Sequence, residues 1–386
     1  MWSAAIACGR EVSAQGWGEQ AFPKTVAAVA RIRCTSVVLK SQVGIVGAGI
    51  GGLCLAQHLR RRGIEVVVFE QDSSPVGRAQ GYRLTLRDTE TVLRGCLPDD
   101  VYELFDRSSG IVGGLDFMDH QLAVQKSLAI TARSVDRSTF KKVLLTGLDV
   151  RFGHALTGYR QSTGGEVFAD FANGETAAVG LLVGADGINS LVRQQLLPEA
   201  RIEALPMDAI VCRSWVDAAT GPWLTPELTN HLGMAYGPQR RNLMFGHMLF
   251  PPDAGRSYVF WGLLTPTGEL PDDLNSALLE WHPGVQQLIA DGDPTQMSRL
   301  RLRTSVPLEP WPTTNVTLLG DAIHAMSPFQ GSGANTAIRD AALLATELEY
   351  GLDGIARYEK AMLDYGFEAV RRSATGTANV LAQRPV

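Results

Sequence analysis

The pattern Gly47-x-Gly49-x-x-Gly52 constrains the fold of this chain more than any other sequence feature. It follows a short apolar run at residues 43–46. Apolar residues then recur at helical spacing from residue 50 to residue 59. A strand that passes through a glycine turn into a helix is the first half of a βαβ unit, so the pattern predicts an α/β fold.

The three glycines have distinct roles in such a unit. Gly47 permits the tight turn, Gly49 lets the backbone approach a pyrophosphate, and Gly52 lets the helix pack on the strand. Residues 65–69 predict the second strand, which closes at Glu70, 18 positions after Gly52. A carboxylate there binds ribose hydroxyls and repels a 2′-phosphate. The sequence therefore predicts a dinucleotide site and disfavours NADP as its occupant.

Composition narrows the class of protein further. The 386 residues are 45% hydrophobic and 19% charged, which suits two or three globular domains and excludes a disordered chain. The net charge of −5 offers no broad cationic face for nucleic acid or anionic lipid. No run reaches the roughly 18 apolar residues of a membrane helix. We therefore expect a small-molecule substrate, no nucleic acid and no integral membrane segment.

Cysteine and histidine usage bears on compartment and metals. The five cysteines are scattered and form no C-x-x-C pair, which favours a reducing, cytoplasmic location. The sequence holds no H-E-x-x-H motif and no close His/Cys cluster, so we expect no metal site. Residues 1–40 are an atypical N-terminal extension, basic and poor in acids. They read as a targeting segment or as an uncleaved, partly ordered extension.

Two further segments carry glycine and aspartate after apolar runs. Asp186-Gly187 follows one such run, and Gly320-Asp321 follows another. Beyond Asp321, more glycines lead into a helix predicted from about Ala334, whose positive end could face a delocalised anion. Each segment alone would pass for a loop. Their order along one chain makes them informative.

These motifs together resemble the group A FAD-dependent monooxygenases, the para-hydroxybenzoate hydroxylase-like family. The resemblance rests on the dinucleotide fingerprint, the Asp-Gly and Gly-Asp motifs, and a segment, residues 135–140, similar to the family's arginine-bearing helix start. It covers nearly everything from Val43 to the C-terminal helix. One departure is Ala325, which follows His324 where many members carry proline.

The resemblance implies FAD as the cofactor and NADPH or NADH as a transient co-substrate. It implies that the fingerprint glycines hold the FAD pyrophosphate, that Glu70 holds the adenosine ribose, and that Arg137 contacts FAD. Asp321 would bind the ribityl or pyrophosphate region of FAD. Asp186 would serve both the structure and the use of the reduced nicotinamide co-substrate. Three positions would lie near the flavin ring: Gly81, Gly333 and Ala334.

The resemblance also implies a domain plan. A Rossmann-type FAD-binding domain is interleaved with an antiparallel-sheet substrate domain and ends in a C-terminal helix. The FAD-binding domain is expected at residues 41–85, 131–203 and 304–386. The substrate domain is expected at residues 86–130 and 204–303.

The implied function is hydroxylation or epoxidation of a small apolar metabolite, with aromatic compounds among the candidates, through a flavin C4a-hydroperoxide. The alternatives are a halogenase or a prenyl-chain reductase on the same fold, or a flavin-binding protein without turnover. The sequence identifies no catalytic acid or base. Four side chains of the expected substrate domain have suitable chemistry, although ordinary packing or solvent exposure outweighs a catalytic role for each: Arg213, Tyr236, His247 and Tyr258.

Overall fold

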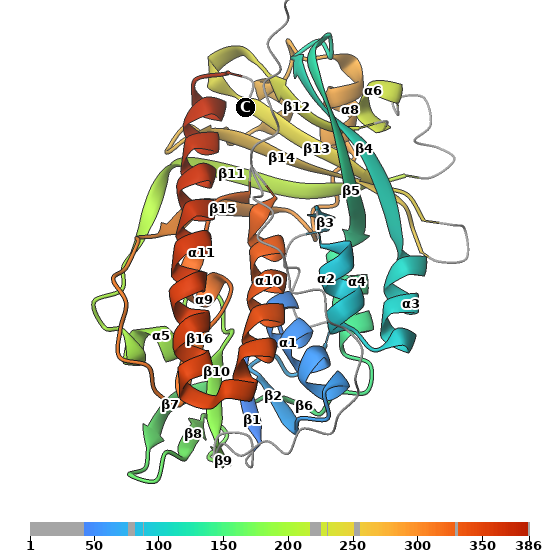
Figure 1. Cartoon of the computed structure of the whole chain (residues 1–386). Coiled ribbons are helices and arrows are strands. Elements are labelled where there is room, and N and C mark those ends of the chain that lie inside the picture. The colour runs from blue at the N-terminus through green and yellow to red at the C-terminus, as the bar shows by residue number, and fades with distance from the viewer. Residues whose placement is uncertain are drawn as a thin grey trace, which may run out of the picture. The chain divides into compact units, whose positions relative to one another are not determined.

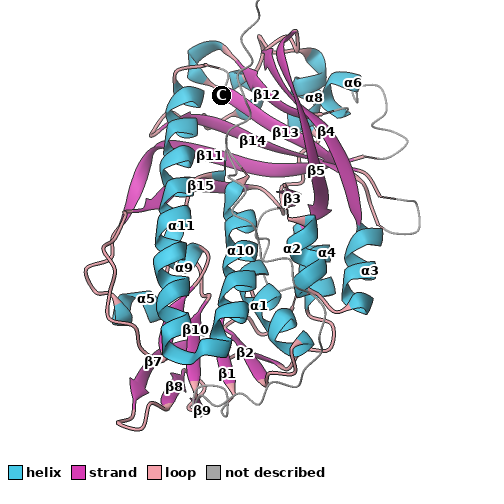
Figure 2. Ribbon diagram, in the orientation of Figure 1, coloured by secondary structure: helices cyan, strands magenta, loops and turns pink. Residues whose placement is uncertain are grey.

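The structure is a computed structural model that describes residues 42–75, 82–87, 89–216, 225–229, 231–250, 255–328 and 331–384. The strands of these residues form one five-stranded, one eight-stranded and one three-stranded sheet (Figures 1 and 2). Within these ranges no helix combines the length and the apolar character that a membrane span requires.

The five-stranded sheet is entirely parallel, with the order β16-β10-β1-β2-β6. Every residue of β1 and β10 is buried, as in a parallel sheet covered on both faces. The predicted βαβ unit is confirmed, and the apolar run before Gly320 forms a strand of the same sheet. The five strands are β1 (Val43–Val46), β2 (Val66–Glu70), β6 (Val150–Phe152), β10 (Leu181–Gly184) and β16 (Val316–Leu318).

Helices and a small antiparallel sheet enclose the parallel sheet. Helix α1 (Ile50–Arg61) packs against α10 (Ser332–Glu347), which packs against the C-terminal helix α11 (Gly351–Leu381) (Figure 1). Val179 packs against Gly44 of β1 and so joins the small sheet to the parallel one. The strands of the small sheet are β7 (Leu156–Gln161), β8 (Val167–Phe171) and β9 (Thr176–Val179). Residues of all these elements share one apolar core.

The eight-stranded sheet has the order β15-β11-β14-β13-β12-β4-β5-β3. The expectation of an antiparallel sheet needs a correction, because β4 and β12 pair in parallel. β3 and the end of β5 also pair here, although the sequence assigned both segments to the FAD-binding domain. The domain limits stay a prediction. The strands are β3 (Arg83–Leu86), β4 (Ser109–Asp119), β5 (Val124–Asp136), β11 (Ile202–Trp215), β12 (Leu232–Tyr236), β13 (Asn242–Met248), β14 (Tyr258–Pro266) and β15 (Ser298–Ser305).

The two faces of this sheet have different coverings. One face packs through Trp261 of β14 against α6 (Pro226–Thr229), α7 (Leu274–Ala277), α8 (Pro283–Ala290) and Trp281, which lies between α7 and α8. The opposite face, which we call the inner face, carries Val211, Met244 and Phe260, and Val380 of α11 packs on part of it. The other helices of the described part are short: α2 (Glu90–Cys96), α3 (Asp99–Ser108), α4 (Arg137–Leu144), α5 (Leu191–Leu196), α9 (Asp321–His324) and the 3-10 turns Pro238–Arg240 and Leu348–Tyr350.

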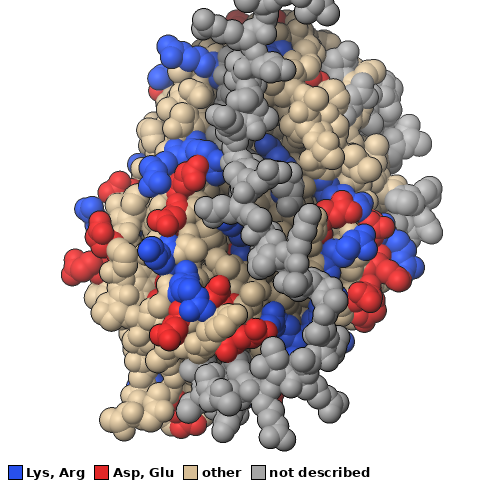
Figure 3. All heavy atoms as spheres, viewed as in Figure 1, with Lys and Arg blue, Asp and Glu red and all other residues tan. Residues whose placement is uncertain are grey.

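Acidic and basic side chains lie next to one another over the described part of the face in Figure 3. The described part of the chain also contains surface ion pairs, such as Arg357 with Glu347 at 2.7 Å and Arg240 with Glu269 at 2.7 Å. Neighbouring charges of opposite sign neutralise one another locally, so the described part of this face presents no wide field of one sign.

Candidate functional site

The turn between β1 and α1 is built around the three predicted glycines. Gly47 has φ +107°, and a Cβ there would lie 2.3 Å from the carbonyl oxygen of Ala185. A Cβ on Gly52 would lie 2.3 Å from the carbonyl oxygen of Gly47. A Cβ on Gly49 would meet its nearest neighbour only at 3.9 Å. Two of the glycines are therefore needed for packing, while the third leaves open space at the end of α1.

The N-terminus of α1 is available to a ligand. Gly49 is the N-cap residue, so no side chain caps the helix, and no acidic residue lies in its first turn. The first backbone N–H groups of any helix have no partner within the helix. An anion placed beside Gly49 would receive these N–H groups and the positive end of the helix dipole.

Glu70 ends β2 and is buried against this turn. Its Oε2 accepts a hydrogen bond from the backbone N–H of Ala48 at 2.8 Å. Its Oε1 accepts one from the backbone N–H of Asp72 at 3.0 Å. The carboxylate predicted to bind a ribose thus also fixes the glycine turn in place.

Arg137 brings together residues that are far apart in the sequence. It begins α4, after Asp136, whose Oδ1 caps the helix by accepting the N–H of Thr139 at 2.7 Å. Burial lowers the pKa of Arg137, and the carboxylates of Asp321, Asp136 and Glu70 oppose this change. The predicted carboxylates Glu70 and Asp321 therefore both lie within electrostatic reach of Arg137.

Asp321 lies at the start of α9, directly after β16. Its side chain is exposed to solvent, yet the surrounding protein raises the pKa of its carboxyl, with His324 and Arg137 opposing the rise. The Asp321 carboxyl is thus open to solvent on one side and surrounded by protein on the others, which places it in a recess. A Cβ on Gly333 would lie 3.8 Å from Asp321 Oδ1, so the first turn of α10 borders the same recess.

Asn335 joins the start of α10 to β3. Its Nδ2 donates to the carbonyl oxygens of Thr85 at 3.0 Å and Gly331 at 2.6 Å, and its Oδ1 accepts the N–H of Arg87 at 3.0 Å. Gly331 is the N-cap of α10, which again has no side-chain cap. Ala334 lies in the first turn. The uncapped end of α10 is thus held beside β3, a contact that the sequence did not predict.

Asp186 touches the glycine turn from the other side. Its Oδ2 accepts the N–H groups of Leu191 at 2.8 Å and Val192 at 3.3 Å and so caps α5. Its Oδ1 is buried and has no partner among the described residues, and burial raises the pKa of the carboxyl. The Cα of Asp186 lies 3.0 Å from the Cβ position of Gly47. The Asp-Gly and fingerprint motifs therefore adjoin.

A buried ion pair between His324 and Asp340 is hydrogen-bonded to the backbone of the Gly-Asp motif. Asp340 Oδ2 accepts hydrogen bonds from His324 Nε2 at 2.7 Å and from the N–H of Gly320 at 2.8 Å. Asp340 Oδ1 accepts one from the hydroxyl of Tyr365 at 2.6 Å. Asp340 and His324 are fully buried. Sequence reasoning missed this network because nothing in the local pattern links α9 to the interior of α10.

The remaining candidates do not join the recess in the same way. Gly81 lies outside the described residues. The Tyr258 hydroxyl donates to Asp136 Oδ2 at 2.8 Å, and the Tyr236 hydroxyl donates to the carbonyl of Arg384 at 2.9 Å, so both have structural partners. His247 alternates with inner-face residues of β13 and points to the other face. Burial and the charge of Arg83 lower its pKa to about 4.

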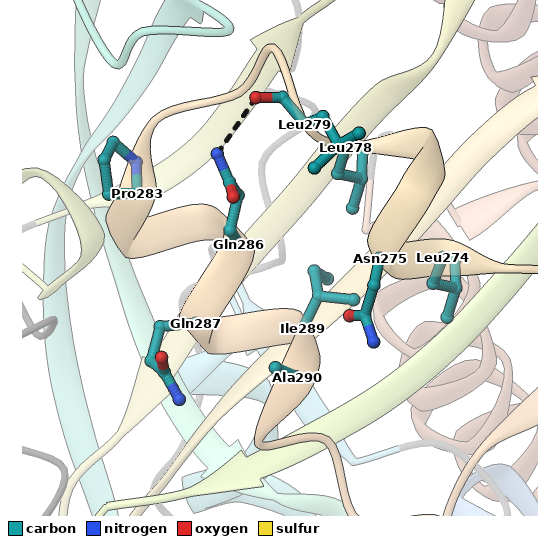
Figure 4. A pocket seen from close by; sticks show the side chains of 9 residues that line it. All are labelled: Leu274, Asn275, Leu278, Leu279, Pro283, Gln286, Gln287, Ile289 and Ala290. Carbon is teal, nitrogen blue, oxygen red and sulfur yellow. Dashed lines mark hydrogen bonds between the residues drawn. The ribbon is translucent and has the colours of Figure 1, made fainter.

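A surface groove of about 350 Å³ lies between α7 and α8 (Figure 4). Across it, Gln286 Nε2 donates to the carbonyl oxygen of Leu279 at 3.2 Å. None of its lining residues belongs to the motifs, and its helices cover the outer face of the eight-stranded sheet. Among the described residues, no cluster of three His, Cys, Asp or Glu side chains is placed to hold a metal.

Comparison with known proteins identifies the family. A family model described as an FAD binding domain matches residues 40–377. The dual O-methyltransferase/FAD-dependent monooxygenase CTB3 of Cercospora beticola is 32% identical over 411 residues, which cover 88% of this chain and 46% of that protein. This chain thus spans about half the length of that relative. The FAD-dependent urate hydroxylase of Mycolicibacterium vanbaalenii is 28% identical over 363 residues, which cover 86% of this chain and 87% of that protein.

A solved structure shares the whole architecture. The crystal structure of a proposed FAD-containing monooxygenase from Photorhabdus luminescens subsp. laumondii TTO1 superposes with a TM-score of 0.81 at 30% identity. It covers 90% of this chain and 100% of that one. The chain therefore belongs to the group A FAD-dependent monooxygenases, the para-hydroxybenzoate hydroxylase-like family.

Proposed function

We propose that this chain is an FAD-dependent monooxygenase that uses NADH or NADPH and O2 to hydroxylate or epoxidise a small apolar molecule. For hydroxylation, the substrate, O2, NAD(P)H and one proton give the hydroxylated product, water and NAD(P)⁺. The observation that carries this proposal is the convergence of Glu70 and Asp321 on Arg137, with Glu70 bound to the N–H of Ala48 beside the uncapped end of α1.

The residues present fit FAD. The open space at Gly49 and the N–H groups behind it suit a pyrophosphate, which Gly47 and Gly52 make possible through the turn. Glu70 would hold the adenosine ribose, and Arg137 would neutralise phosphate charge. Asp321, in its recess, makes no hydrogen bond within the described residues and would accept ribityl hydroxyl groups.

The other end of the site suits the flavin ring. Gly333 and Ala334 would lie beside it, at the uncapped N-terminus of α10. The partial positive charge there favours negative charge on the neighbouring group. When bound, FAD would supply the redox chemistry: two electrons from NAD(P)H and the activation of O2. The inner face of the eight-stranded sheet would exclude water from the reacting groups.

Labelled O2 tests the activity directly. In a screen of aromatic and prenyl substrates, NAD(P)H oxidation should rise with the true substrate, and one atom of labelled O2 should appear in the product. Substrate turnover without O2 would instead indicate a reductase. A chain that holds FAD but oxidises no NAD(P)H with any substrate would indicate a binding protein.

Asp321→Ala is expected to weaken FAD binding without loss of stability. Charge-assisted hydrogen bonds contribute about 1.5–3 kcal/mol, so the Kd for FAD should rise roughly 10- to 100-fold. Because the carboxylate is exposed to solvent and makes no hydrogen bond with the described residues, FAD-free protein should unfold at about the same temperature. Fluorescence titration with FAD and thermal unfolding measure the two effects.

Asp272→Ala is the matched control, since Asp272 is exposed and lies in the loop before α7. Asp272→Ala should change neither the Kd for FAD nor the unfolding temperature of the FAD-free protein. Equal FAD affinity in the Asp321 variant and the wild type would remove Asp321 from the site.

A further inference from the structure

The inner face of the eight-stranded sheet is apolar but incompletely covered. Val211, Met244 and Phe260 are only partly buried, although their strands lie in the interior of the sheet. Gly246 and Gly262 add positions without side chains on the same face. Partly exposed apolar side chains on an inward face leave room for an apolar ligand.

Arg83 is a cation on this mainly apolar face, which also carries Arg213 of β11, stacked on Trp215. It lies on β3, where its register partner is Asp136, and its side chain is on the same face as that of Thr85. Its Nη1 lies 3.4 Å from the Cβ position of Gly246 and thus over β13. The guanidinium therefore projects across the inner face rather than away from it.

Arg83 has little to bind within the protein. Within the described residues its one hydrogen bond runs from Nη1 to Thr85 Oγ1 at 3.0 Å, and its Nε is buried without a partner. No described carboxylate lies within 4.0 Å of the guanidinium. Burial lowers its pKa to about 10, with Tyr258 opposing the change, so the group remains charged at neutral pH.

Two other arginines whose Nε is likewise buried without a partner are held by the protein through other contacts. Arg193 donates to the carbonyl oxygens of Ala322 at 2.8 Å and Ile188 at 2.9 Å. Arg213 stacks on Trp215, with its Cζ 4.1 Å from the ring centroid, and lies near Asp293. A desolvated cation without such partners is destabilising. Departures of this kind from good packing occur at functional sites.

The position of Arg83 relates it to the flavin end of the site. Thr85, which Arg83 contacts, lies 3.9 Å from the Cβ position of Gly331 at the N-cap of α10. Asn335 fixes this arrangement by binding the carbonyl oxygen of Thr85. Arg83 therefore lies between the apolar inner face and the end of α10 where the flavin ring would bind.

We propose that Arg83 binds an anionic oxygen of the substrate, a carboxylate or a phenolate, and that the substrate is an apolar molecule bearing such a group. The inference rests on the proposed function, since it takes the inner face beside α10 as the substrate site. Arginine suits this role because its planar fork of donors matches oxyanion geometry and remains charged. The apolar residues would bind the rest of the molecule.

Matched charged and neutral probes test this in the FAD-loaded full chain. The carboxylate probe is 2-naphthoate against 2-naphthamide, and the phenolate probe is pentafluorophenolate against pentafluoroanisole. Binding is measured by the change in flavin absorbance and by calorimetry. At least one charged probe should bind the wild type at least about tenfold more tightly than its neutral counterpart. The probe that shows this preference identifies the anionic group as a carboxylate or a phenolate.

Arg83→Gln should remove that preference, because it should weaken binding of the charged probe about 10- to 100-fold and leave binding of the neutral probe unchanged. Arg83→Lys should restore part of it. Arg83→Gln should not lower the unfolding temperature, whereas Arg193→Gln, which breaks two hydrogen bonds to carbonyl groups, should lower it. Arg107→Gln, on the exposed face of α3, is the surface control.

Several outcomes would overturn the proposal. Two concern the wild type: equal binding of charged and neutral probes, and no binding of either charged probe at millimolar concentration. Two concern Arg83→Gln: a preference for the charged probe that survives, and loss of FAD, which would make Arg83 a cofactor residue. A wild-type chain that holds no FAD would instead refute the proposed function.

Discussion

Alanine at Gly49 is expected to abolish tight FAD binding while leaving the fold intact, whereas alanine at Gly52 is expected to disrupt the fold itself. Gly49 has φ −75° and ψ 173°, which any residue adopts, and its Cβ would enter open space. The substitution should change the free energy of unfolding by less than about 1 kcal/mol. The same methyl group occupies the place proposed for the pyrophosphate, so the Kd for FAD should rise about 100-fold or more.

Gly52 differs because its neighbours are protein atoms. A Cβ there would lie 2.3 Å from the carbonyl oxygen of Gly47 and 3.1 Å from the Cβ of Ala185. The backbone of α1 would have to move away from β1, which should destabilise the chain by more than about 3 kcal/mol.

Urea unfolding of FAD-free protein and FAD titration separate the two effects. Gly49→Val serves as a stronger form of the first variant. An unstable Gly49→Ala, or a Gly49→Val that binds FAD normally, would contradict the assignment of this space to the cofactor.

Removing the carboxylate of Asp340 is expected to cause the largest loss of stability at a single buried polar group. Asp340→Ala leaves His324, the N–H of Gly320 and the Tyr365 hydroxyl without their shared acceptor. Breaking one side of a buried ion pair costs about 3–5 kcal/mol. Asp340→Asn keeps an acceptor oxygen in place and should lose less. Urea unfolding of the FAD-free variants measures both, and equal stability of Asp340→Ala and wild type would contradict the role of this network.

The same pair gives stability a pH dependence. Burial alone would lower the pKa of His324, but the Asp340 carboxylate overcomes this and raises it above its usual value of 6.5. A raised histidine pKa adds stability that is fully present below about pH 6.5 and is lost as pH rises through the folded-state value. The free energy of unfolding should therefore fall as pH rises above 6.5 in the wild type and change less in His324→Gln. Parallel pH profiles of the two proteins would contradict this assignment.

The cofactor-binding half of the fold could be predicted because its signals are local. The strand, glycine turn, helix and terminal acid from residue 43 to Glu70 lie within one short segment, and each side chain acts on its near neighbours. Helix α10 begins at Ser332, two residues before the position of about 334 predicted from the sequence, because its N-cap is Gly331, in the left-handed conformation, within a glycine-rich run.

The rest depends on pairings between distant segments. Asn335 binds Thr85 across 250 positions, and β4 pairs with β12 in parallel across more than a hundred. Periodicity indicates which face of an element is buried but not which element covers it. Asn335, Asp340 and Arg83 therefore gave no sequence signal beyond their residue types.

The central claim is that segments around Gly49, Glu70, Arg137 and Asp321 form one FAD site. Its most direct test is the FAD content of the purified full chain, measured after denaturation, for the wild type, Gly49→Val, Asp321→Ala and Asp272→Ala. We expect one FAD per chain in the wild type and the Asp272 variant, none in the Gly49 variant, and a reduced content in the Asp321 variant. A folded wild type that takes up no FAD, or full FAD content in all four proteins, would contradict the account.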